Sequence, residues 1–262
     1  MKRLFFLVAF LSILNTGKAS HRMDKTSLIA VDFNKTFVGS INHKIDVVFN
    51  LKNINGKITG FYYYHKIGIE INLTGIIDNG ELLLYELDDQ NIKKAKITGK
   101  LLKNSFLGRW EDLSTKKNFP IQLEETNKSI PSLPKKLLGT YKFDTKTGCR
   151  LTLKISKIKG TYVYSFNSSV RTLKGKVTFS RSLDEKLVYI NLNGIEWADN
   201  TGAISDGDLD AEPKETLNLP TSVGGLLSDG EITIQNSGNS MNAYLKIGEC
   251  SAMYIQLKRI GG

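Results

Sequence analysis

The chain has 262 residues, 40% of them hydrophobic, and 36 basic against 26 acidic residues give a formal net charge of +10. This apolar content excludes an intrinsically disordered chain, and the length suffices for two domains of ordinary size. The basic excess is largely spread along the sequence and is not gathered on one face with interleaved aromatic residues, so we predict no nucleic-acid partner.

The first 19 residues have the layout of a secretory signal peptide. Two basic residues precede an apolar run from Leu4 to Leu14, and Gly17 and Ala19 occupy the −3 and −1 positions of a cleavage site. The alternative, a membrane anchor, needs about 20 apolar residues, and no later segment is apolar enough to span a bilayer. We therefore predict an exported protein, periplasmic or extracellular, with residues 1–19 removed and no transmembrane segment.

Residues 24–126 form the first predicted domain, with about eight short strands and no helical period. Turn signals such as Asn55-Gly56 and Asn79-Gly80 separate runs in which apolar and polar residues alternate. One such run, Ile67–Gly75, is predicted as a single strand with its apolar residues on one face and its polar residues on the other. The first face has Ile67, Ile69, Ile71 and Leu73, and the second has Glu70 and Asn72. This spacing is typical of an all-β barrel or sandwich.

Glycines inside the predicted strands favour the barrel over the flat sandwich. Glycine in a strand marks a bend or a close approach of two backbones, and such bends let a small sheet close on itself. They recur at Gly60, Gly75, Gly99 and Gly108.

The strand Glu81–Leu87 has an ambiguous phase because leucines occupy both of its faces. Either Leu83, Tyr85 and Leu87 point inward, or Leu82, Leu84 and Glu86 do. We expect the first arrangement and a filled barrel, because tyrosine is more often half-buried than glutamate. In the second arrangement Glu86 would need hydroxyl partners such as Tyr62 and Tyr64.

Residues 127–136 are predicted as a proline-containing linker, and residues 137–262 as a second, decorated β-domain. The two halves share nine identities when residues 39–77 are aligned with 139–177 without a gap, including Lys57-Ile58 with Lys157-Ile158. We interpret this as a tandem duplication. Only two cysteines occur, and an even count in an exported chain predicts a Cys149–Cys250 disulfide in the second domain.

The sequence carries no catalytic motif that we recognise, and we predict no enzyme activity and no cofactor. Asp206, Asp208 and Asp210 resemble the start of a calcium loop, but Ala211 and Leu217 stand where that loop needs glycine and glutamate. A calcium site there is therefore a weak candidate. A carboxylate pair could serve a glycosidase, and its candidates, each next to an aromatic residue, are Glu86, Glu111 and Glu196.

The strand ends Gly60-Phe61-Tyr62 and Gly108-Arg109-Trp110 resemble those of lipocalin- and avidin-type barrels and of small exported bacterial β-domains. This resemblance implies a barrel and no particular ligand. We expect ligand contacts to come from Tyr62, Tyr64, Glu86, Trp110 and Trp197.

These observations predict an exported, non-enzymatic binding protein that recognises a macromolecule. The partner is either another protein, as for an inhibitor or immunity factor, or a surface glycan. One alternative is a carrier with a small ligand inside a barrel, although eight strands leave room for one small ligand at most. The other is a carboxylate-based secreted hydrolase.

Overall fold

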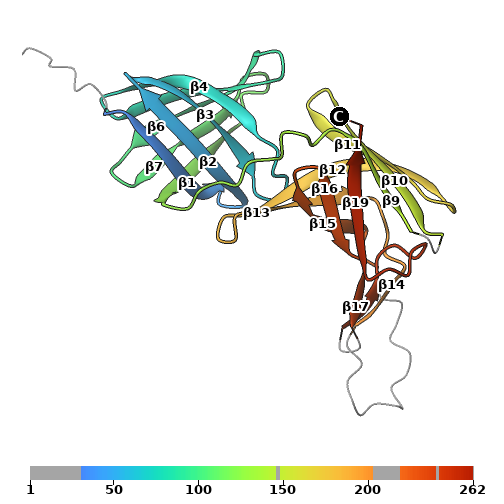
Figure 1. Ribbon diagram of the computed structural model, residues 1–262. Coiled ribbons are helices and arrows are strands. Elements are labelled where there is room, and N and C mark those ends of the chain that lie inside the picture. Colours follow the sequence, from blue (N-terminus) through green and yellow to red (C-terminus); the bar gives the residue numbers. More distant parts are fainter. Residues whose placement is uncertain (1–30, 146–147, 203–218, 240–241, 262) are drawn as a thin grey trace, which may run out of the picture.

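The computed structural model describes residues 31–145, 148–202, 219–239 and 242–261, and in these ranges the protein is all-β (Figure 1). Its strands form two closed antiparallel barrels in tandem, which confirms the predicted fold class and the choice of barrels over sandwiches. None of the described residues belongs to a helix that could span a membrane. The predicted signal peptide and Asp206, Asp208 and Asp210 lie outside the described residues.

The first barrel is a meander in which each strand pairs with the next, and β8 returns to pair with β1. Its strands are β1 (Phe33–Ile41), β2 (Ile45–Ile54), β3 (Lys57–Tyr64), β4 (Ile71–Asp78), β5 (Glu81–Leu87), β6 (Lys93–Leu101), β7 (Ser105–Asp112) and β8 (Asn118–Thr126). Short turns after β2, β4 and β6 gather at one end of the barrel, which we call the turn end. The opposite end carries the remaining connections, and we call it the loop end.

The second barrel closes through pairing of its last strand with its first. Its strands, in order around the barrel, are β9 (Gly139–Asp144), β10 (Arg150–Ile158), β11 (Thr161–Asn167), β12 (Thr172–Ser182), β13 (Leu187–Asn193), β15 (Ser222–Ser228), β16 (Glu231–Gln235) and β19 (Tyr254–Ile260). A three-stranded sheet of β14 (Asp199–Gly202), β18 (Asn242–Leu245) and β17 (Ser237–Asn239) projects from this barrel in Figure 1. This sheet is part of the decoration that the sequence predicted.

Glycines let neighbouring strands of the first barrel approach closely. A Cβ atom on Gly60 would lie 2.0 Å from the carbonyl oxygen of Asn50, and one on Gly75 would lie 2.0 Å from that of Leu83. Any side chain at these positions would therefore push two strands apart. The strand glycines therefore lie, as predicted, where two backbones approach closely.

The gapless alignment of the two halves is out of register with the structure. The β2–β3 turn contains Asn55-Gly56, whereas the equivalent β10–β11 turn contains Lys159-Gly160. Lys57-Ile58 therefore begins β3, while Lys157-Ile158 ends β10. Gly60 lies within a strand and Gly160 has a φ of +78° in a turn, so their pairing was wrong. The tandem barrels remain, with the β10–β11 hairpin four positions away from its place in that alignment.

The segment from His65 to Glu70 departs from the predicted strand. β4 begins only at Ile71, and the preceding residues leave the first barrel and reach the second. The amide of Phe179 on β12 donates a 2.9 Å hydrogen bond to the carbonyl of Ile67. Ile69 packs against the core of the second barrel and does not enter that of the first. The isoleucines do alternate along the sequence, but of the three only Ile71 belongs to β4. Ile67 and Ile69 contact the second barrel.

Arg181 is the centre of that contact and is completely buried. From the last part of β12, its guanidinium donates to the carbonyl of Gly68 at 2.7 and 3.1 Å and to that of Pro131 at 3.2 Å. It also pairs with the Glu70 carboxylate at 2.8 Å and lies 4.7 Å from the ring centroid of Tyr63. A charge taken out of water requires such a full set of partners. Arg181 therefore joins three parts of the chain: both barrels and the segment between them.

Replacing Arg181 with methionine should lower the free energy of unfolding by about 3 kcal/mol, because it removes a charge-assisted hydrogen-bond network from a buried site. Urea denaturation followed by circular dichroism measures this change. As a matched control, Arg150→Met removes an arginine whose side chain is 79% exposed, and the expected change is within about 0.5 kcal/mol. Equal effects of the two variants would contradict the role assigned to Arg181.

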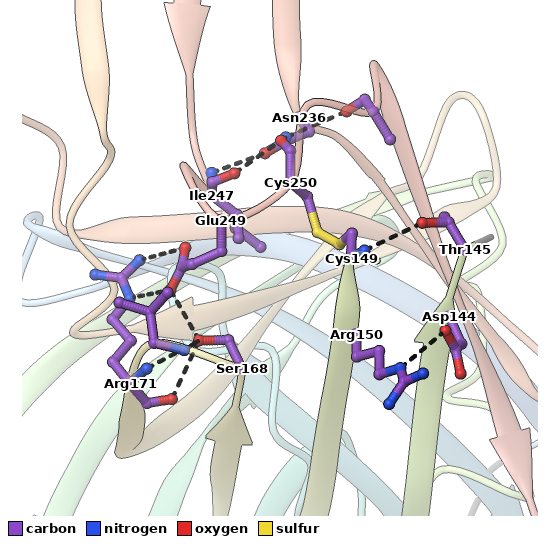
Figure 2. The surroundings of a disulfide bond; sticks show 12 residues. Asp144, Thr145, Cys149, Arg150, Ser168, Arg171, Asn236, Ile247, Glu249 and Cys250 are labelled. Carbon is purple, nitrogen blue, oxygen red and sulfur yellow. Dashed lines mark hydrogen bonds and ion pairs between the residues drawn. A yellow bond between two sulfur atoms is a disulfide. The ribbon is translucent and has the colours of Figure 1, made fainter. Parts of the chain in front are cut away.

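The predicted disulfide between Cys149 and Cys250 is confirmed, with 5.4 Å between the two Cα atoms (Figure 2). Cys149 immediately precedes β10, and Cys250 lies in the irregular segment before β19. The bond closes a loop with a sequence separation of 101. It therefore links an early and a late part of the second barrel.

Reduction of this bond should destabilise the protein by about 3–5 kcal/mol, because a loop of about 100 residues gains entropy in the unfolded state. The native protein should show no thiol in a titration with Ellman's reagent. The double variant Cys149→Ser, Cys250→Ser serves as the control, because its unfolding should be unaffected by reductant. Two reactive thiols in the native protein would contradict the pairing.

Candidate functional site

Four of the five residues predicted for ligand contact come together inside the first barrel. The Tyr62 hydroxyl donates a 2.5 Å hydrogen bond to Oε1 of Glu86, and the indole nitrogen of Trp110 donates to the same oxygen. The Tyr62 and Tyr64 hydroxyl oxygens are 3.2 Å apart. Since the single Tyr62 proton serves the carboxylate, Tyr64 supplies the proton of this second bond.

The phase that we expected for β5 was wrong. Leu82, Leu84 and Glu86 are buried, and Tyr85 is on the outer face, where the Lys93 ammonium lies 3.8 Å from its ring centroid. A buried glutamate is compatible with the interior because tyrosine and tryptophan donors satisfy it. The barrel is nevertheless filled, since the residues around this cluster, including Phe49, are almost wholly buried and Phe49 stacks on Tyr62 at 4.6 Å.

Burial raises the pKa of Glu86 above its usual range, although the hydrogen bonds from Tyr62 and Trp110 favour the carboxylate. Burial, together with the nearby Glu86 charge, also raises the pKa of Tyr62 well above the ordinary value of a tyrosine. The phenol therefore remains a donor, and Glu86 is the titrating group of this cluster.

Tyr64 and Trp110 are the partly exposed members of the cluster, whereas Tyr62 and Glu86 are buried. Tyr64 lines a depression of about 380 Å³ at the loop end, together with Lys44, Ile45, Asp46, Lys66 and Ile67. Glu86, with only 7% of its surface exposed, does not line it. The geometry of Glu86 is therefore that of an internal structural group, and its contact with a ligand stays a prediction.

The three candidate carboxylates do not face one another. Glu86 points into the first barrel, whereas Glu111 lies on its outer face and pairs with Lys96 at 2.9 Å. Glu196 belongs to the second barrel, where it lines a cavity of about 490 Å³ with Trp197 and Arg171. The arrangement that a glycosidase needs is not formed by any pair of these three residues.

Trp197, the fifth predicted residue, lies at the base of the projecting sheet. Its indole nitrogen donates a 2.7 Å hydrogen bond to the carbonyl of Ser222. The ammonium of Lys246 lies 5.2 Å from its ring and 5.3 Å from that of Tyr244. Trp197 is therefore held in place by a backbone acceptor and a cation–π contact.

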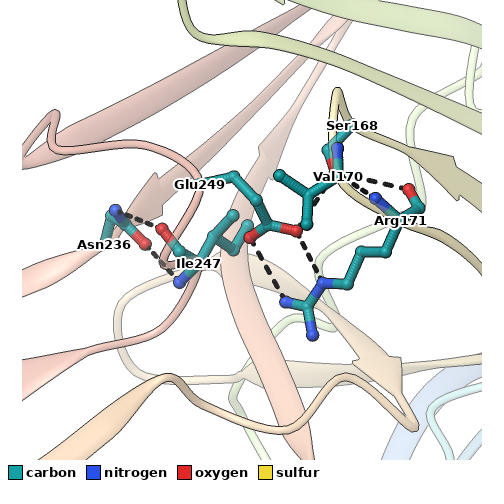
Figure 3. Close-up of polar contacts among 6 residues, drawn as sticks. All are labelled: Ser168, Val170, Arg171, Asn236, Ile247 and Glu249. Carbon is teal, nitrogen blue, oxygen red and sulfur yellow. Dashed lines mark hydrogen bonds and ion pairs between the residues drawn. The ribbon is translucent and has the colours of Figure 1, made fainter.

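Polar side chains that the sequence did not single out hold the irregular parts of the second barrel. Figure 3 shows Glu249 accepting hydrogen bonds from Arg171 at 2.6 and 3.3 Å and from Ser168 at 3.1 Å. Burial raises the pKa of Glu249, but its backbone hydrogen bond and Arg171 outweigh burial and hold it below the usual range. Asn236 is completely buried and bonds both polar groups of Ile247. These residues fix the segment that leads to Cys250.

Another concave surface of the second barrel is a groove of about 480 Å³ on its outer face, which we call the outer groove. It crosses β12, β13, β15, β16 and β19, whose neighbours lie side by side in Figure 1. The residues that carry its chemistry are Ser180, Tyr189, Asn191, Thr233, Gln235 and Tyr254. Each of them alternates with buried core residues along its strand, so all six side chains point away from the barrel core.

Glycine forms the floor of the outer groove. Gly224 is paired with Asn191 across the sheet, and a Cβ atom there would lie 3.3 Å from Oδ1 of Asn191. The Asn191 amide nitrogen donates a 3.0 Å hydrogen bond to Ser180. The amide is therefore oriented by its neighbour, and its oxygen lies above the glycine as an acceptor.

The outer groove is almost uncharged. Lys246 is the one ionisable ammonium or carboxylate among its lining residues, and burial lowers its pKa. The remaining polar groups are hydroxyls and amides, which act as donors and acceptors at any physiological pH. Such a surface suits a neutral, hydrogen-bonding ligand.

The two-barrel chain has no match among protein-family models, and neither a curated protein nor a solved structure is significantly similar to it. The function of the outer groove therefore has to be inferred from its own side chains.

Glu86→Gln should remove one pH-dependent part of the stability while keeping an oxygen acceptor for Tyr62 and Trp110. Because the pKa of Glu86 is raised in the folded state, its protonated form stabilises the protein fully below the unfolded pKa of about 4.3. This contribution is lost as the pH rises through the folded pKa. The variant should thus gain stability relative to the wild type as the pH rises from about 4 toward neutrality.

Urea denaturation of both proteins at a series of pH values measures this difference. Glu185→Gln, on an exposed turn, is the matched control and should differ from the wild type by a constant amount. A constant difference for Glu86→Gln would show that Glu86 titrates normally.

Proposed function

We propose that this is an exported, non-enzymatic binding protein that recognises a neutral surface glycan through the outer groove of the second barrel. The observation that carries the proposal is the combination in one concave surface of oriented amide and hydroxyl groups, two tyrosines and a glycine floor.

The polar groups of the outer groove match those of a sugar. A saccharide presents hydroxyl groups around its edge, each of which both donates and accepts. Asn191 and Gln235 offer amides and Ser180 offers a hydroxyl, whereas the Thr233 hydroxyl donates to Glu231 at 3.0 Å and is left as an acceptor. Donors and acceptors are therefore both present along the groove. Few fixed charges have to lose water when such a ligand binds.

The tyrosines suit the apolar face of a sugar ring. Tyr189 and Tyr254 flank the groove, and Tyr254 is 51% exposed although it is a large aromatic residue. An exposed tyrosine combines a flat apolar surface with a polar tip. Gly224 between them leaves room for a ring to lie against the sheet.

A protein partner is the less favoured macromolecule. The centres of protein interfaces are enriched in tyrosine, tryptophan and arginine. The lining of the outer groove has two tyrosines but neither tryptophan nor arginine, and most of its other polar groups are hydroxyls and amides. The carrier alternative finds little support in barrel interiors that are filled by their own side chains. Export is supported by the signal-peptide layout of residues 1–19 and by the disulfide.

Binding of the mature protein to a glycan array, followed by calorimetric titration with the best-bound oligosaccharide, tests this function. Gly224→Leu should weaken binding at least about tenfold, because its side chain occupies the floor of the groove. Tyr254→Ala should weaken it about 5- to 30-fold, which corresponds to about 1–2 kcal/mol.

Tyr85→Ala is the matched control, since it removes a tyrosine from the outer face of the first barrel and should leave affinity unchanged. Circular dichroism checks that all variants are folded. Absence of binding to every neutral glycan on the array, or equal losses in the control, would overturn the proposal in favour of a protein partner.

A further inference from the structure

Lysines gather on the outer wall of the second barrel. Strands β9, β10, β11 and β12 pair in this order and lie side by side in Figure 1. Along each of them buried core residues alternate with side chains that point outward. Four of the outward residues are exposed lysines, and with the residues between them they form a surface that we call the lysine face: Lys142, Lys154, Lys174 and Lys176.

The register of the strands brings these lysines together. Lys154 on β10 pairs with Ser165 on β11, which pairs in turn with Lys174 on β12. Lys154 and Lys174 are therefore two strands apart, which corresponds to about 10 Å between their backbones. Lys176 lies two positions along β12 from Lys174, and Lys142 pairs with the residue two positions before Lys154. The four positive charges thus belong to one continuous part of the sheet.

The fold does not neutralise these charges. Among the residues that the structure describes, none of the four lysines forms an ion pair. Asp144 is the single acidic residue at the outward positions of β9–β12, and it pairs with Arg150 at 3.6 Å. Lys258 on β19 lies directly opposite Lys142, and Glu231 on β16 lies opposite Lys258. Like charges opposite each other destabilise a sheet, so Lys142 and its three neighbours offer charge that an external anion can use.

The side chains between the lysines are mostly neutral hydrogen-bonding groups. Four hydroxyls and an amide occupy outward positions of β9, β10 and β11, at Thr140, Thr152, Ser156, Ser165 and Asn167. Such groups can donate to and accept from the hydroxyls of a sugar chain. The lysine face therefore combines charge with partners for a polar, uncharged backbone.

This composition distinguishes between polyanions. No outward residue of β9–β12 is aromatic, whereas single-stranded nucleic acids stack their bases on aromatic side chains. Binding in a membrane interface also requires apolar side chains that enter the lipid. Ile158 and Ile260 are 58% and 43% exposed, but they lie at the ends of their strands, and Val163 is the one apolar residue between the lysines. An acidic polysaccharide fits the lysine face better than either alternative.

We propose that the lysine face binds an acidic polysaccharide, whose carboxylate or sulfate groups pair with the four ammonium groups and whose hydroxyls contact Thr152 and Ser165. The ammonium of lysine is a compact charge on a flexible stem, so it can reach anions spaced along an extended chain. The lysine face shares no side chain with the lining of the outer groove. The two sites can therefore be tested separately.

Isothermal titration calorimetry with dextran sulfate at physiological ionic strength tests the lysine face, with neutral dextran as the same backbone without its charges. The wild type should bind dextran sulfate. The double variant Lys154→Gln, Lys174→Gln should weaken that binding at least about tenfold and reduce its salt dependence, because fewer counterions are exchanged. Any binding of neutral dextran at the outer groove should be the same in the variant. Polygalacturonate, in parallel, shows whether carboxylates replace sulfates.

The double variant Lys52→Gln, Lys117→Gln is the matched control. It removes the same charge from two exposed lysines of the first barrel that form no ion pair among the described residues, and it should leave dextran sulfate affinity unchanged. Ile158→Asn should also leave it unchanged, and circular dichroism checks that all variants are folded.

Three outcomes would overturn the proposal. The first is no binding of either acidic polysaccharide by the wild type. The second is an equal loss in the two lysine variants, which would show that net charge alone governs binding. The third is binding to phosphatidylglycerol vesicles but to neither polysaccharide, with a loss in Ile158→Asn, which would indicate a membrane surface as the partner.

Discussion

The guanidinium group of Arg181 has no access to water, and this constraint determines how the two barrels are joined. A buried charge is tolerated only where fixed dipoles and an opposite charge replace its hydration. Here the replacements come from Gly68, Glu70 and Pro131, none of which belongs to the second barrel. The second barrel therefore carries at its edge a group that only the preceding part of the chain can satisfy. Ile69 reinforces the dependence, because it covers part of the second core.

Both barrel interiors are filled by their own side chains. Residues that could bind a ligand therefore lie on the outer faces and at the ends of the barrels. The apolar residues of each interior are almost wholly buried, and even Glu86 is satisfied by internal donors. Polar or charged residues on the core-facing phase occur where a barrel ends, as for Lys35 and Glu125. A β-barrel wall alternates between inside and outside, so the partly exposed side chains of Lys35 and Glu125 mark one position at which the interior of the first barrel meets solvent. The outer groove arises differently, from a glycine on the solvent-facing phase.

The sequence predicts the fold because strand alternation and turn residues are local signals. Asn55-Gly56 and Asn79-Gly80 form hairpin turns, and the strand glycines lie where backbones approach. The disulfide follows from having only two cysteines. The phase of β5 is not determined locally, because leucine is compatible with either face and the deciding partners, Tyr62 and Trp110, lie on other strands. The same limit explains Ile67 and Ile69, whose alternation is that of a strand although their partners are in the second barrel.

Long-range partners also explain why some important residues could not be identified from the sequence. An arginine or asparagine in an exported β-protein is expected at the surface, and only the folded chain shows that Arg181 and Asn236 are buried. The residues of the outer groove form no motif in the sequence, because they come from five strands. Gly224, which forms the floor of the groove, has no side chain. The grouping of Glu86 with Tyr62 and Tyr64 corresponds to the arrangement of β5 that the sequence did not favour, and the bond from Trp110 to Glu86 was not predicted.

The loop from His65 to Glu70 has a consequence for the order in which the chain is assembled. It belongs to the part of the sequence that is synthesised first, and it contacts the part that follows. Domains generally fold as units during synthesis, the N-terminal one first. The first barrel can close through its own eight strands before the second emerges, and its projecting loop then serves as a template on which β12 completes its hydrogen bonds. The order of synthesis and the direction of dependence between the barrels thus coincide, because the loop that accepts the hydrogen bond from the Phe179 amide is already present when β12 forms.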